Sequence, residues 1–367
     1  MRLEELKLTD YRNCRNIELD MKSSKILIIG KNAQGKTNIL ESIYFLSCLK
    51  SPRTSNNIEL INFDAEKLEI FSNIVKSSTE IELDYSYTRD KTRELCINKV
   101  KTRPKDFKQV LKTVLFSTSD LALLRGNPSD RRDWLDRAIS QVYPAYDDRF
   151  SKYDKIRVQK NNFLKDNYGQ IDETLLEVFN EQLVITGANI IFLRKKFLRE
   201  IEVLAKEKHY NISSSEKLEI KYDCSFLDDE EEIEDIAQRF KQSLEERKVE
   251  EIRRGQCCAG PHRDDIIFTI NGSDASKFAS QGQQRTIVLA LKLSELDIIT
   301  SKTGDEPILL LDDVLAELDD MRQNYLLKAI RSEIQTIITS VDTLLFDEKF
   351  LENVKIYKIE NGRLSLN

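Results

Sequence analysis

Histidine is the scarcest chemically versatile residue in this chain of 367 residues, which contains only His209 and His262. A histidine-rich metal site is therefore excluded, and any histidine-based catalysis depends on one of these two side chains. The six cysteines are scattered and form no Cys-x-x-Cys pair, although Cys257 and Cys258 are adjacent. This pattern is typical of reduced cysteines that fill small apolar spaces, so it argues against a disulfide framework or a zinc site.

Long apolar runs are also missing. No run approaches the roughly 18 apolar residues that a membrane-spanning helix needs. The first 13 residues, MRLEELKLTDYRN, contain no apolar core of a signal peptide. We therefore expect a cytoplasmic protein without a membrane partner. Heptads are not sustained far enough for a long coiled coil, and no internal repeat is visible.

The charges are unevenly spread along the chain. The net charge of −6 argues mildly against a nucleic-acid partner, but residues 89–112 contain nine Lys or Arg against three Asp or Glu. Residues 226–235, in contrast, contain seven acids and no base. Such a chain can carry a basic face despite its acidic total. Either run can equally be a solvated face that binds no partner.

Hydrophobic periodicity predicts an α/β fold with a helical insertion. Alternation predicts strands within residues 1–30 and 68–98, a helix follows over 37–49, and residues 119–251 are helical in character. Strand patterns return after Gly260, with two hairpins that turn at Asn-Gly, DIIFTINGSD and KIYKIENGRLSL. Between these hairpins we expect a helix from Ser280, the strand PILLLDD, a helix over 319–332 and the strand IQTIITS. The predicted domains are a head of residues 1–118 and 256–367 and an inserted helical lobe of residues 119–255.

The stretch GKNAQGKT matches the phosphate-binding loop G-x-x-x-x-G-K-[ST] at every fixed position, between a buried strand and a helix. The glycines allow a tight loop whose N–H groups face an anion, and the helix adds its positive N-terminal end. We expect Lys36 to neutralise the β- and γ-phosphates of ATP and the Thr37 hydroxyl to bind Mg²⁺. The expected nucleotide-binding residues here are Gly30, Lys31, Asn32, Ala33, Gln34, Gly35, Lys36, Thr37 and Asn38.

The segment ILLLDD supplies the second magnesium anchor that such a loop needs. Four apolar residues form a strand, and Asp312 follows at its carboxyl end, where ligands of α/β proteins bind. We expect Asp312 to hold Mg²⁺ through water. Asp313 is the candidate catalytic residue that orients or deprotonates the attacking water.

The stretch ASQGQ, residues 279–283, precedes an almost wholly apolar helix, and Ser280 and Gln283 have the spacing of a capping box. It resembles the LSGGQ signature of ABC-type ATPases, with Ala279 for Leu and Gln281 for the first Gly. The order of phosphate loop, signature, ILLLDD and ELD is also the ABC order. The resemblance implies two ATP molecules between two head-to-tail subunits. Ser280, Gln281, Gly282 and Gln283 would then bind the partner's ATP, and Asp319 would lie at the dimer seam.

Across essentially its whole length the chain resembles the RecF family of recombination and repair ATPases. The carrying motifs are LKLTDYRNCRNIEL, GKNAQGKTNILESIYFLS, LLRGNPSDRRDWLD, GPHRDD, SQGQQR and LLLDDVLAELD. The resemblance implies an ABC/SMC-type P-loop ATPase head, with mixed sheets plus helices and no long coiled coil. It also implies ATP-dependent dimerisation, slow hydrolysis, binding to single-stranded or gapped DNA, cooperation with RecR, and roles in repair, replication and SOS induction.

Five sites in the sequence refine what the resemblance implies. Arg12 looks like the arginine that SMC-type heads place near the nucleotide, and Arg53 like a loop residue that senses DNA. Asp313 stands where transporter ATPases carry Glu, which fits a slow switch. IITSVD has no switch histidine, so Thr339 or Ser340 stands in its place, and FSTSD occupies the place of the glutamine loop without a glutamine.

The candidate DNA contacts are basic side chains in NKVKTRPKDFK, Arg131 and Arg132, and RKKFLR at 194–199, with His262 and Arg263 as further candidates. Each can equally be a solvated residue or an ion-pair partner within the lobe. The alternatives to a DNA clamp are an ATP-gated scaffold with little DNA affinity of its own and a transporter ATPase subunit. The latter predicts Glu at 313 and His near 340, which the chain lacks. A small-molecule kinase has no use for the Ser280 signature.

Overall fold

The computed structural model describes residues 1–167, 169–227, 232–330, 333–360 and 362–366. These residues form two compact units, unit 1 of Met1–Asp120 with Arg285–Asn367, and unit 2 of Leu121–Gln284. The first predicted boundary lies two residues before this division. The second, at 255/256, lies 29 residues before it, because strand β10 (Asp265–Ile270) pairs with strand β9 (Leu218–Asp223) inside unit 2.

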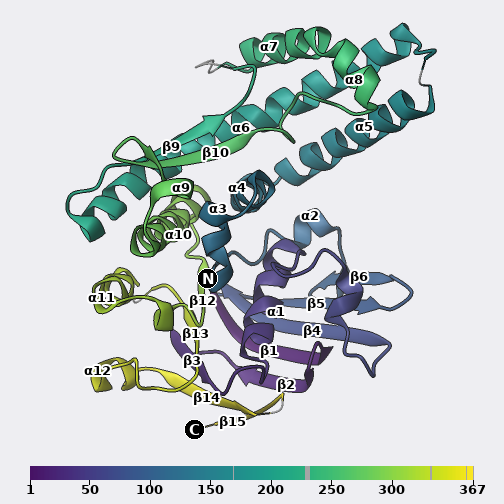
Figure 1. Cartoon of the computed structure of the whole chain (residues 1–367). Coiled ribbons are helices and arrows are strands. Elements are labelled where there is room, and N and C mark those ends of the chain that lie inside the picture. Colours follow the sequence, from purple (N-terminus) through teal and green to yellow (C-terminus); the bar gives the residue numbers. More distant parts are fainter. Residues whose placement is uncertain (168, 228–231, 331–332, 361, 367) are drawn as a thin grey trace. The chain divides into compact units, whose positions relative to one another are not determined.

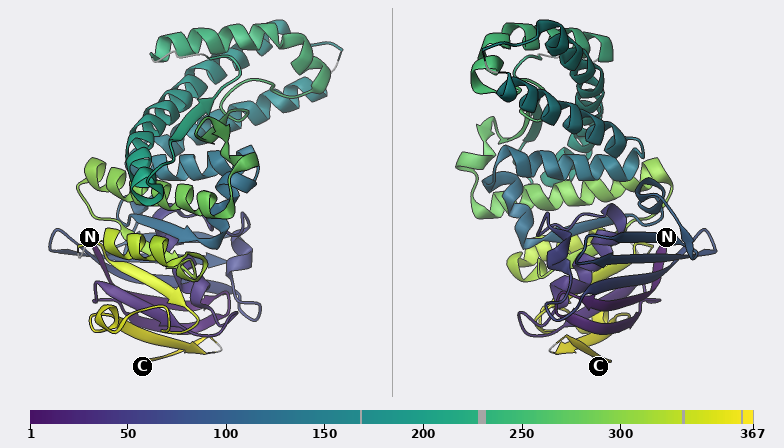
Figure 2. Two further views of the ribbon diagram at one scale, coloured as in Figure 1. Left: turned by 60° about the vertical axis from the view of Figure 1, so that its left-hand side comes forward. Right: turned by 90° about the vertical axis from the view of Figure 1, so that its right-hand side faces the viewer.

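Unit 1 contains an antiparallel sheet and a mainly parallel sheet (Figures 1 and 2). The antiparallel sheet has the order β2-β1-β4-β5-β6-β7, from strands Cys14–Asp20, Arg2–Tyr11, Lys67–Lys76, Thr79–Thr88, Arg93–Ile97 and Val100–Lys101. The second sheet has the order β15-β14-β3-β13-β12-β8, from Arg363–Leu366, Lys355–Glu360, Lys25–Ile29, Thr336–Ser340, Ile308–Asp312 and Thr113–Ser117. Among the strands that the structure describes in this sheet, β15 alone runs antiparallel to its neighbour. The expected strands of both chain ends are therefore confirmed.

Helix α1 (Lys36–Cys48) connects the two sheets of unit 1. Phe45 lies edge-on to Tyr85 of the antiparallel sheet, with ring centroids 4.8 Å apart, and Ser47 hydrogen-bonds Thr113 of the parallel sheet at 2.6 Å. Because α1 touches both sheets, almost all of its residues are buried. This burial explains the apolar residues that recur from Ile39 to Cys48 and fixes the direction of the helix N-terminus.

The remaining helices of unit 1 follow the expected order. Helix α10 (Gln281–Thr303) begins in unit 2 and continues in unit 1, and its start has the predicted capping box. Helix α11 (Asp320–Ala329) follows β12, and short helices α2 (Pro104–Phe107) and α12 (Glu348–Leu351) lie between strands. Turns of 3₁₀ helix occupy Asn57–Leu60, Thr118–Leu121 and Leu315–Glu317.

Unit 2 is mainly helical, with helices α3 (Ala122–Arg125), α4 (Pro128–Val142), α5 (Tyr146–Asp166), α6 (Glu173–Ser213), α7 (Ile233–Glu246), α8 (Lys248–Arg254) and α9 (Ala275–Phe278). Helices α5 and α6 lie side by side (Figure 1). The helical interpretation of residues 119–251 was wrong at β9, where Leu218, Ile220 and Tyr222 alternate. β9 pairs with β10, which turns at Asn271-Gly272 into β11 (Ser273–Asp274), as the Asn-Gly signal predicted. Residues 228–231 of the acidic run lie outside the described residues.

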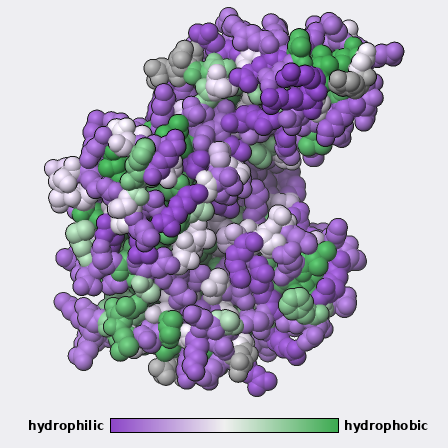
Figure 3. Space-filling view, viewed as in Figure 1, coloured by the Kyte–Doolittle hydropathy of each residue, from purple (hydrophilic) through white to green (hydrophobic). Residues whose placement is uncertain are grey.

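Helix α6 bears on the expectation that no apolar run approaches the length of a membrane span. Its 41 residues are long and apolar enough to cross a membrane by length and composition alone, with a mean hydropathy of 1.2 over an 18-residue stretch. A core helix of a protein that never meets a membrane can have the same composition, and 44% of that stretch is buried. On the face drawn in Figure 3, hydrophilic residues dominate and hydrophobic ones form separate patches. One such helix is therefore a weak indication of a span.

Candidate nucleotide-binding site

The phosphate loop follows β3 and leads into α1, as predicted. Gly35 has φ of 112° and Ala33 has φ of 65°, so the loop uses left-handed backbone at two positions. A Cβ on Gly30 would lie 2.5 Å from the Ile359 carbonyl oxygen, and one on Gly35 would lie 2.8 Å from Asn13 Oδ1. Only glycine fits at either position, which explains the two fixed glycines of the motif.

The Lys36 ammonium sits at the centre of this loop and is almost fully buried, with 3% of the side chain exposed. It donates to the Gly30 carbonyl at 2.8 Å and lies 3.6 Å from Asp313 Oδ2. A cavity of about 600 Å³ opens beside it. Its lining includes residues 32–37, Asn13, Asn38, Glu41, Arg53, Ser117, Thr118, Ser119, Asp312 and Asp313. The FSTSD segment thus reaches the cavity through its serines and threonine.

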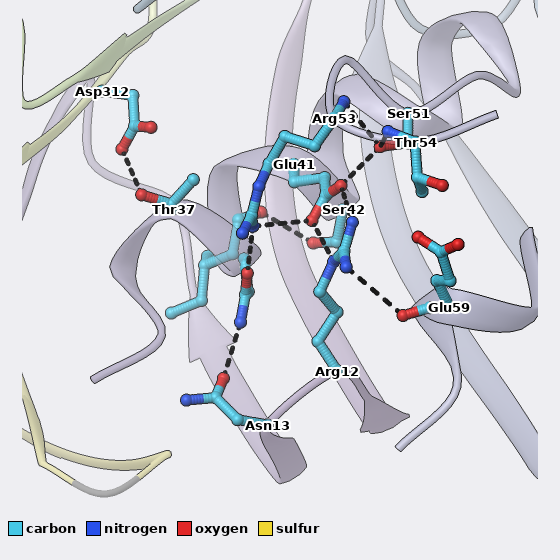
Figure 4. Close-up of polar contacts among 12 residues, drawn as sticks. Arg12, Asn13, Thr37, Glu41, Ser42, Ser51, Arg53, Thr54, Glu59 and Asp312 are labelled. Atoms are coloured by element: carbon cyan, nitrogen blue, oxygen red, sulfur yellow. Dashed lines mark hydrogen bonds and ion pairs between the residues drawn. The ribbon is translucent and has the colours of Figure 1, made fainter. Parts of the chain in front are cut away.

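Thr37 and Asp312 meet although 275 positions separate them in the chain. The Thr37 hydroxyl donates to Asp312 Oδ1 at 3.0 Å (Figure 4), and the Thr339 hydroxyl donates to the same oxygen at 2.9 Å. Burial raises the pKa of Asp312, while the hydrogen bonds from Thr339 and Thr37 act in the opposite direction. A nearby cation would therefore stabilise the ionised carboxylate.

Asp313 directly follows and takes a left-handed backbone with φ of 52°. Its N–H donates to the Thr339 hydroxyl at 2.9 Å, and its carboxylate faces Lys36. The carboxyl ends of β3, β12 and β13 meet at this edge, since Asp312 pairs with Thr339 and Ile29 with Ser340. Thr339, not only the two aspartates, is thus part of the site.

A second group of polar residues surrounds Glu41 of α1 (Figure 4). The Glu41 carboxylate is 1% exposed and accepts two hydrogen bonds from Arg12 at 2.6 Å each, one from Ser51 at 2.5 Å and one from Arg53 at 3.3 Å. Arg53 also donates to Asn38 Oδ1 at 2.7 Å and lines the cavity. Arg12 is bound to Glu41 and the Glu59 carbonyl, so its expected place at the nucleotide stays a prediction. The sequence signal that could have identified Glu41 as a buried, functional carboxylate is its position among the apolar residues of α1.

The signature residues lie in unit 2. Ser280 N–H donates to Gln283 Oε1 at 2.7 Å, and Gln283 N–H donates to Ser280 Oγ at 3.2 Å, which completes the capping box. Ser280 and Gln281 are exposed, Gly282 and Gln283 are half-buried, and Gln283 also donates to Glu216 at 2.8 Å. In unit 1, Asp319 caps α11 by accepting from Arg322 N–H at 2.9 Å. The contacts of residues 280–283 with a partner's nucleotide, and the place of Asp319 at a dimer seam, remain predictions.

Several candidate DNA contacts have partners within their own unit. Arg131 forms a bidentate pair with Asp265 at 2.7 and 2.8 Å, and Arg132 donates to the Asp264 carbonyl at 2.7 Å. Arg194 is 1% exposed and forms a bidentate pair with Asp136. These contacts favour the ion-pair interpretation of these arginines over DNA contact.

His262 also has partners within unit 2. Its ring contacts the Tyr153 hydroxyl at 2.6 Å and the Cys257 carbonyl at 3.2 Å. Arg263 donates to the same carbonyl at 3.2 Å. Burial, more than the neighbouring arginines, lowers the pKa of His262 to about 3. These contacts tie His262 and Arg263 of the GPHRDD segment to other residues of unit 2.

The oxygen donors of the cavity fit a magnesium nucleotide. Among the described residues, no three His, Cys, Asp or Glu side chains are grouped to hold a metal ion by themselves. Thr37 and Asp312 present two oxygens instead, and Mg²⁺ usually takes one or two protein ligands together with phosphates and water. The glycine cradle and the buried Lys36 ammonium fit the phosphates.

The comparisons with known proteins agree with this geometry. A family described as RecF/RecN/SMC N terminal domain matches residues 2–365. The DNA replication and repair proteins RecF of Bacillus velezensis and Bacillus subtilis are 39% and 38% identical to this chain, over 99% of it and their own full length. A solved structure of the recombination mediator protein RecF with ATP in the RecFOR pathway superposes with a TM-score of 0.93 at 33% identity, covering 100% of this chain and 97% of that one. An Smc head bound to a domain of ScpA, 14% identical, has a TM-score of 0.55 over 100% of this chain and 98% of that chain, and shows likeness of fold alone.

Proposed function

The chain belongs to the RecF/RecN/SMC N-terminal-domain family and shares the ABC/SMC-type head fold, and from this premise we propose that it is an ATP-switched DNA clamp of recombinational repair. ATP closes a head-to-tail dimer, the closed dimer holds gapped or single-stranded DNA in the cytoplasm and recruits RecR, and slow hydrolysis opens it. The observation that carries the proposal is the contact between Thr37 and Asp312 beside the buried Lys36, which supports a site for Mg²⁺ and nucleotide.

Residues of unit 1 would hold the nucleotide. Lys36 would bind the β- and γ-phosphate oxygens, and Thr37 and Asp312 would hold Mg²⁺. Bound Mg·ATP supplies the negative charge that this pocket neutralises and the phosphoanhydride bond that is cut. The loop N–H groups and the N-terminus of α1 would orient the phosphates.

Asp313 is held near Lys36 before nucleotide binds, at 3.6 Å between Oδ2 and Nζ. A phosphate that takes over Lys36 would leave the Asp313 carboxylate free to accept a proton from water. The pairing therefore couples the catalytic base to the presence of nucleotide. The short aspartate arm suits a slow switch.

The exposed N-terminus of α10 is proposed to complete a partner's site. Its first N–H groups point out of the helix, and a helix N-terminus favours a phosphate anion. Ser280 and Gln281 are exposed in unit 2 and so are available to a second copy of the chain. Such a contact would explain a signature without a ligand site of its own.

The test is fluorescence anisotropy of a labelled gapped duplex with ATP, ADP or no nucleotide, at one stated salt concentration. The clamp predicts at least about tenfold tighter binding with ATP, equal to 1.4 kcal/mol. Lys36→Met should abolish the difference, and the matched control Lys50→Met, an exposed lysine just after α1, should retain it. Equal binding in all three states would contradict the clamp.

The second candidate is an ATP-gated scaffold with little DNA affinity of its own. It is favoured by the ion pairs that basic side chains of residues 89–112 form with nearby carboxylates. Lys99 lies 3.7 Å from Glu82 and Lys101 lies 3.8 Å from Glu94. Arg103 lies 3.1 Å from Asp106. These exposed pairs reduce the net positive charge of the run. The scaffold predicts weak anisotropy changes in all states together with ATP-dependent dimers in sedimentation.

A further inference from the structure

Thr339 is the side chain that joins both aspartates of the ILLLDD segment. Its hydroxyl donates to Asp312 Oδ1 and accepts from the Asp313 N–H, both at 2.9 Å. The Thr339 hydroxyl oxygen also lies 3.4 Å from the Leu311 carbonyl oxygen. Thr339 is 1% exposed, so water does not compete for these bonds. A hydroxyl has one proton and two lone pairs, and this one uses the proton on Asp312 and one lone pair on Asp313.

The hydrogen bond from Thr339 occupies Oδ1 of Asp312, which determines which carboxylate oxygen remains available to a cation. Oδ1 accepts from Thr37 at 3.0 Å as well as from Thr339, so two hydroxyls from different elements hold one oxygen. Oδ2 accepts from neither of them. The carboxylate plane is thereby set before any cation arrives, as is usual for partners behind a metal ligand.

On Asp313 the contact fixes the backbone. A non-glycine residue at φ of 52° is strained by about 1 kcal/mol or more unless its surroundings hold it there. The hydrogen bond to Thr339 satisfies the Asp313 N–H in this conformation. The same conformation directs the Asp313 carboxylate toward Lys36 and the cavity.

We propose that Thr339 is a positioning residue of the ATP site, which sets the Asp312 carboxylate for Mg²⁺ and aims Asp313 at the attacking water. A threonine hydroxyl does not titrate near neutral pH, so its role is orientation and not proton transfer. The inference rests on the proposed ATP hydrolysis. It gives Thr339, which stands where the sequence lacks a switch histidine, a specific role at the end of β13.

The test compares Thr339→Val, which keeps the shape but loses the hydroxyl, with Thr339→Ser, which restores it. Thr336→Val is the matched control, because Thr336 lies on the same strand, is fully buried and donates to the Ile334 carbonyl at 3.2 Å. Five quantities are measured: kcat for ATP, KM for ATP, the Mg²⁺ concentration for half-maximal binding of a fluorescent ATP analogue, analogue binding in EDTA, and the melting temperature.

The expected result is a loss of kcat and a rise in the Mg²⁺ requirement of Thr339→Val, each by about 10- to 100-fold, the usual cost of an outer partner of a metal site. KM and analogue binding in EDTA should stay near wild type, because the phosphate loop is intact. Thr339→Ser should recover most of the activity, and Thr336→Val should behave as wild type.

Three results would overturn the assignment: a Thr339→Val protein with wild-type kcat and Mg²⁺ requirement, a Thr339→Ser protein as impaired as Thr339→Val, or an equal loss in Thr336→Val. Should Thr339→Val melt early, Thr339→Ala repeats the comparison with a smaller side chain. A wild-type protein that neither binds nor hydrolyses ATP would instead overturn the proposed function itself.

Discussion

Replacing Glu41 with glutamine is expected to destabilise unit 1 by about 3 kcal/mol, at the lower end of the cost of breaking a buried ion pair. The carboxylate is 1% exposed and accepts both Arg12 bonds, at 2.6 Å each, together with those from Ser51 and Arg53. Glutamine keeps the volume but turns one acceptor into a donor that faces donors. We use the lower end of that range of costs because 16% of the Arg12 side chain is exposed. Water can therefore partly solvate the guanidinium after its carboxylate partner is lost.

The assay is calorimetric unfolding of the full chain, with the transition of unit 1 identified by its shift on adding ATP. A loss of 3 kcal/mol corresponds to a melting temperature lower by about 6–12 °C for a unit of this size. Arg12→Gln should cost a similar amount, and the double variant should cost at least about 2 kcal/mol less than the two single changes combined. Additive losses, or a Glu41→Gln shift below about 2 °C, would refute the idea that Glu41 and Arg12 act as one buried pair.

Three further outcomes are expected. Ser280→Arg should leave ATP binding to the monomer intact but abolish ATP-driven dimers in sedimentation; normal dimers would disprove the contact in trans. Lys36→Arg should raise the ATP concentration needed for dimerisation, because the larger guanidinium must fit where the Lys36 ammonium donates to the Gly30 carbonyl at 2.8 Å. An unchanged ATP titration of dimerisation would contradict this. His262→Gln should gain stability relative to wild type as pH falls from about 6.5 to about 3, at up to about 1.4 kcal/mol per pH unit, because the depressed pKa of His262 makes the folded state resist a proton that the unfolded state accepts. Parallel stability curves of the two proteins would show that His262 does not limit acid stability.

The phosphate loop and the two aspartates could be predicted because each is encoded by neighbouring residues. GKNAQGKT carries its loop geometry in its own glycines, and ILLLDD carries its place at a strand end in four apolar residues. Thr339 could be suspected from its strand, but its role depends on the register of β12 against β13. No local pattern determines that register, since all strands of a buried parallel sheet look alike.

The roles of the charged residues were the hardest to predict, because they too depend on partners that are distant in the sequence. Arg131 and Arg132 look like a basic pair for DNA, but their partners lie in residues 264–265, more than 130 positions later. The Glu41 cluster likewise joins three segments of the chain. Sequence reveals that a charge exists, whereas burial and pairing depend on the tertiary fold.

The order of the strands in the parallel sheet has a consequence for synthesis of the protein. Strands β3 and β8 leave the ribosome early, but β12 and β13, which lie between them in the sheet, follow only after about 190 further residues. At about 5–20 residues per second, that delay is roughly 10–40 s. During this time the apolar strand KILII lacks both its neighbours, and unit 2 is completed first. The nascent phosphate loop therefore lacks its partner Asp312 until translation is nearly finished, so early interruption of synthesis yields an exposed, aggregation-prone sheet edge and an incomplete cavity.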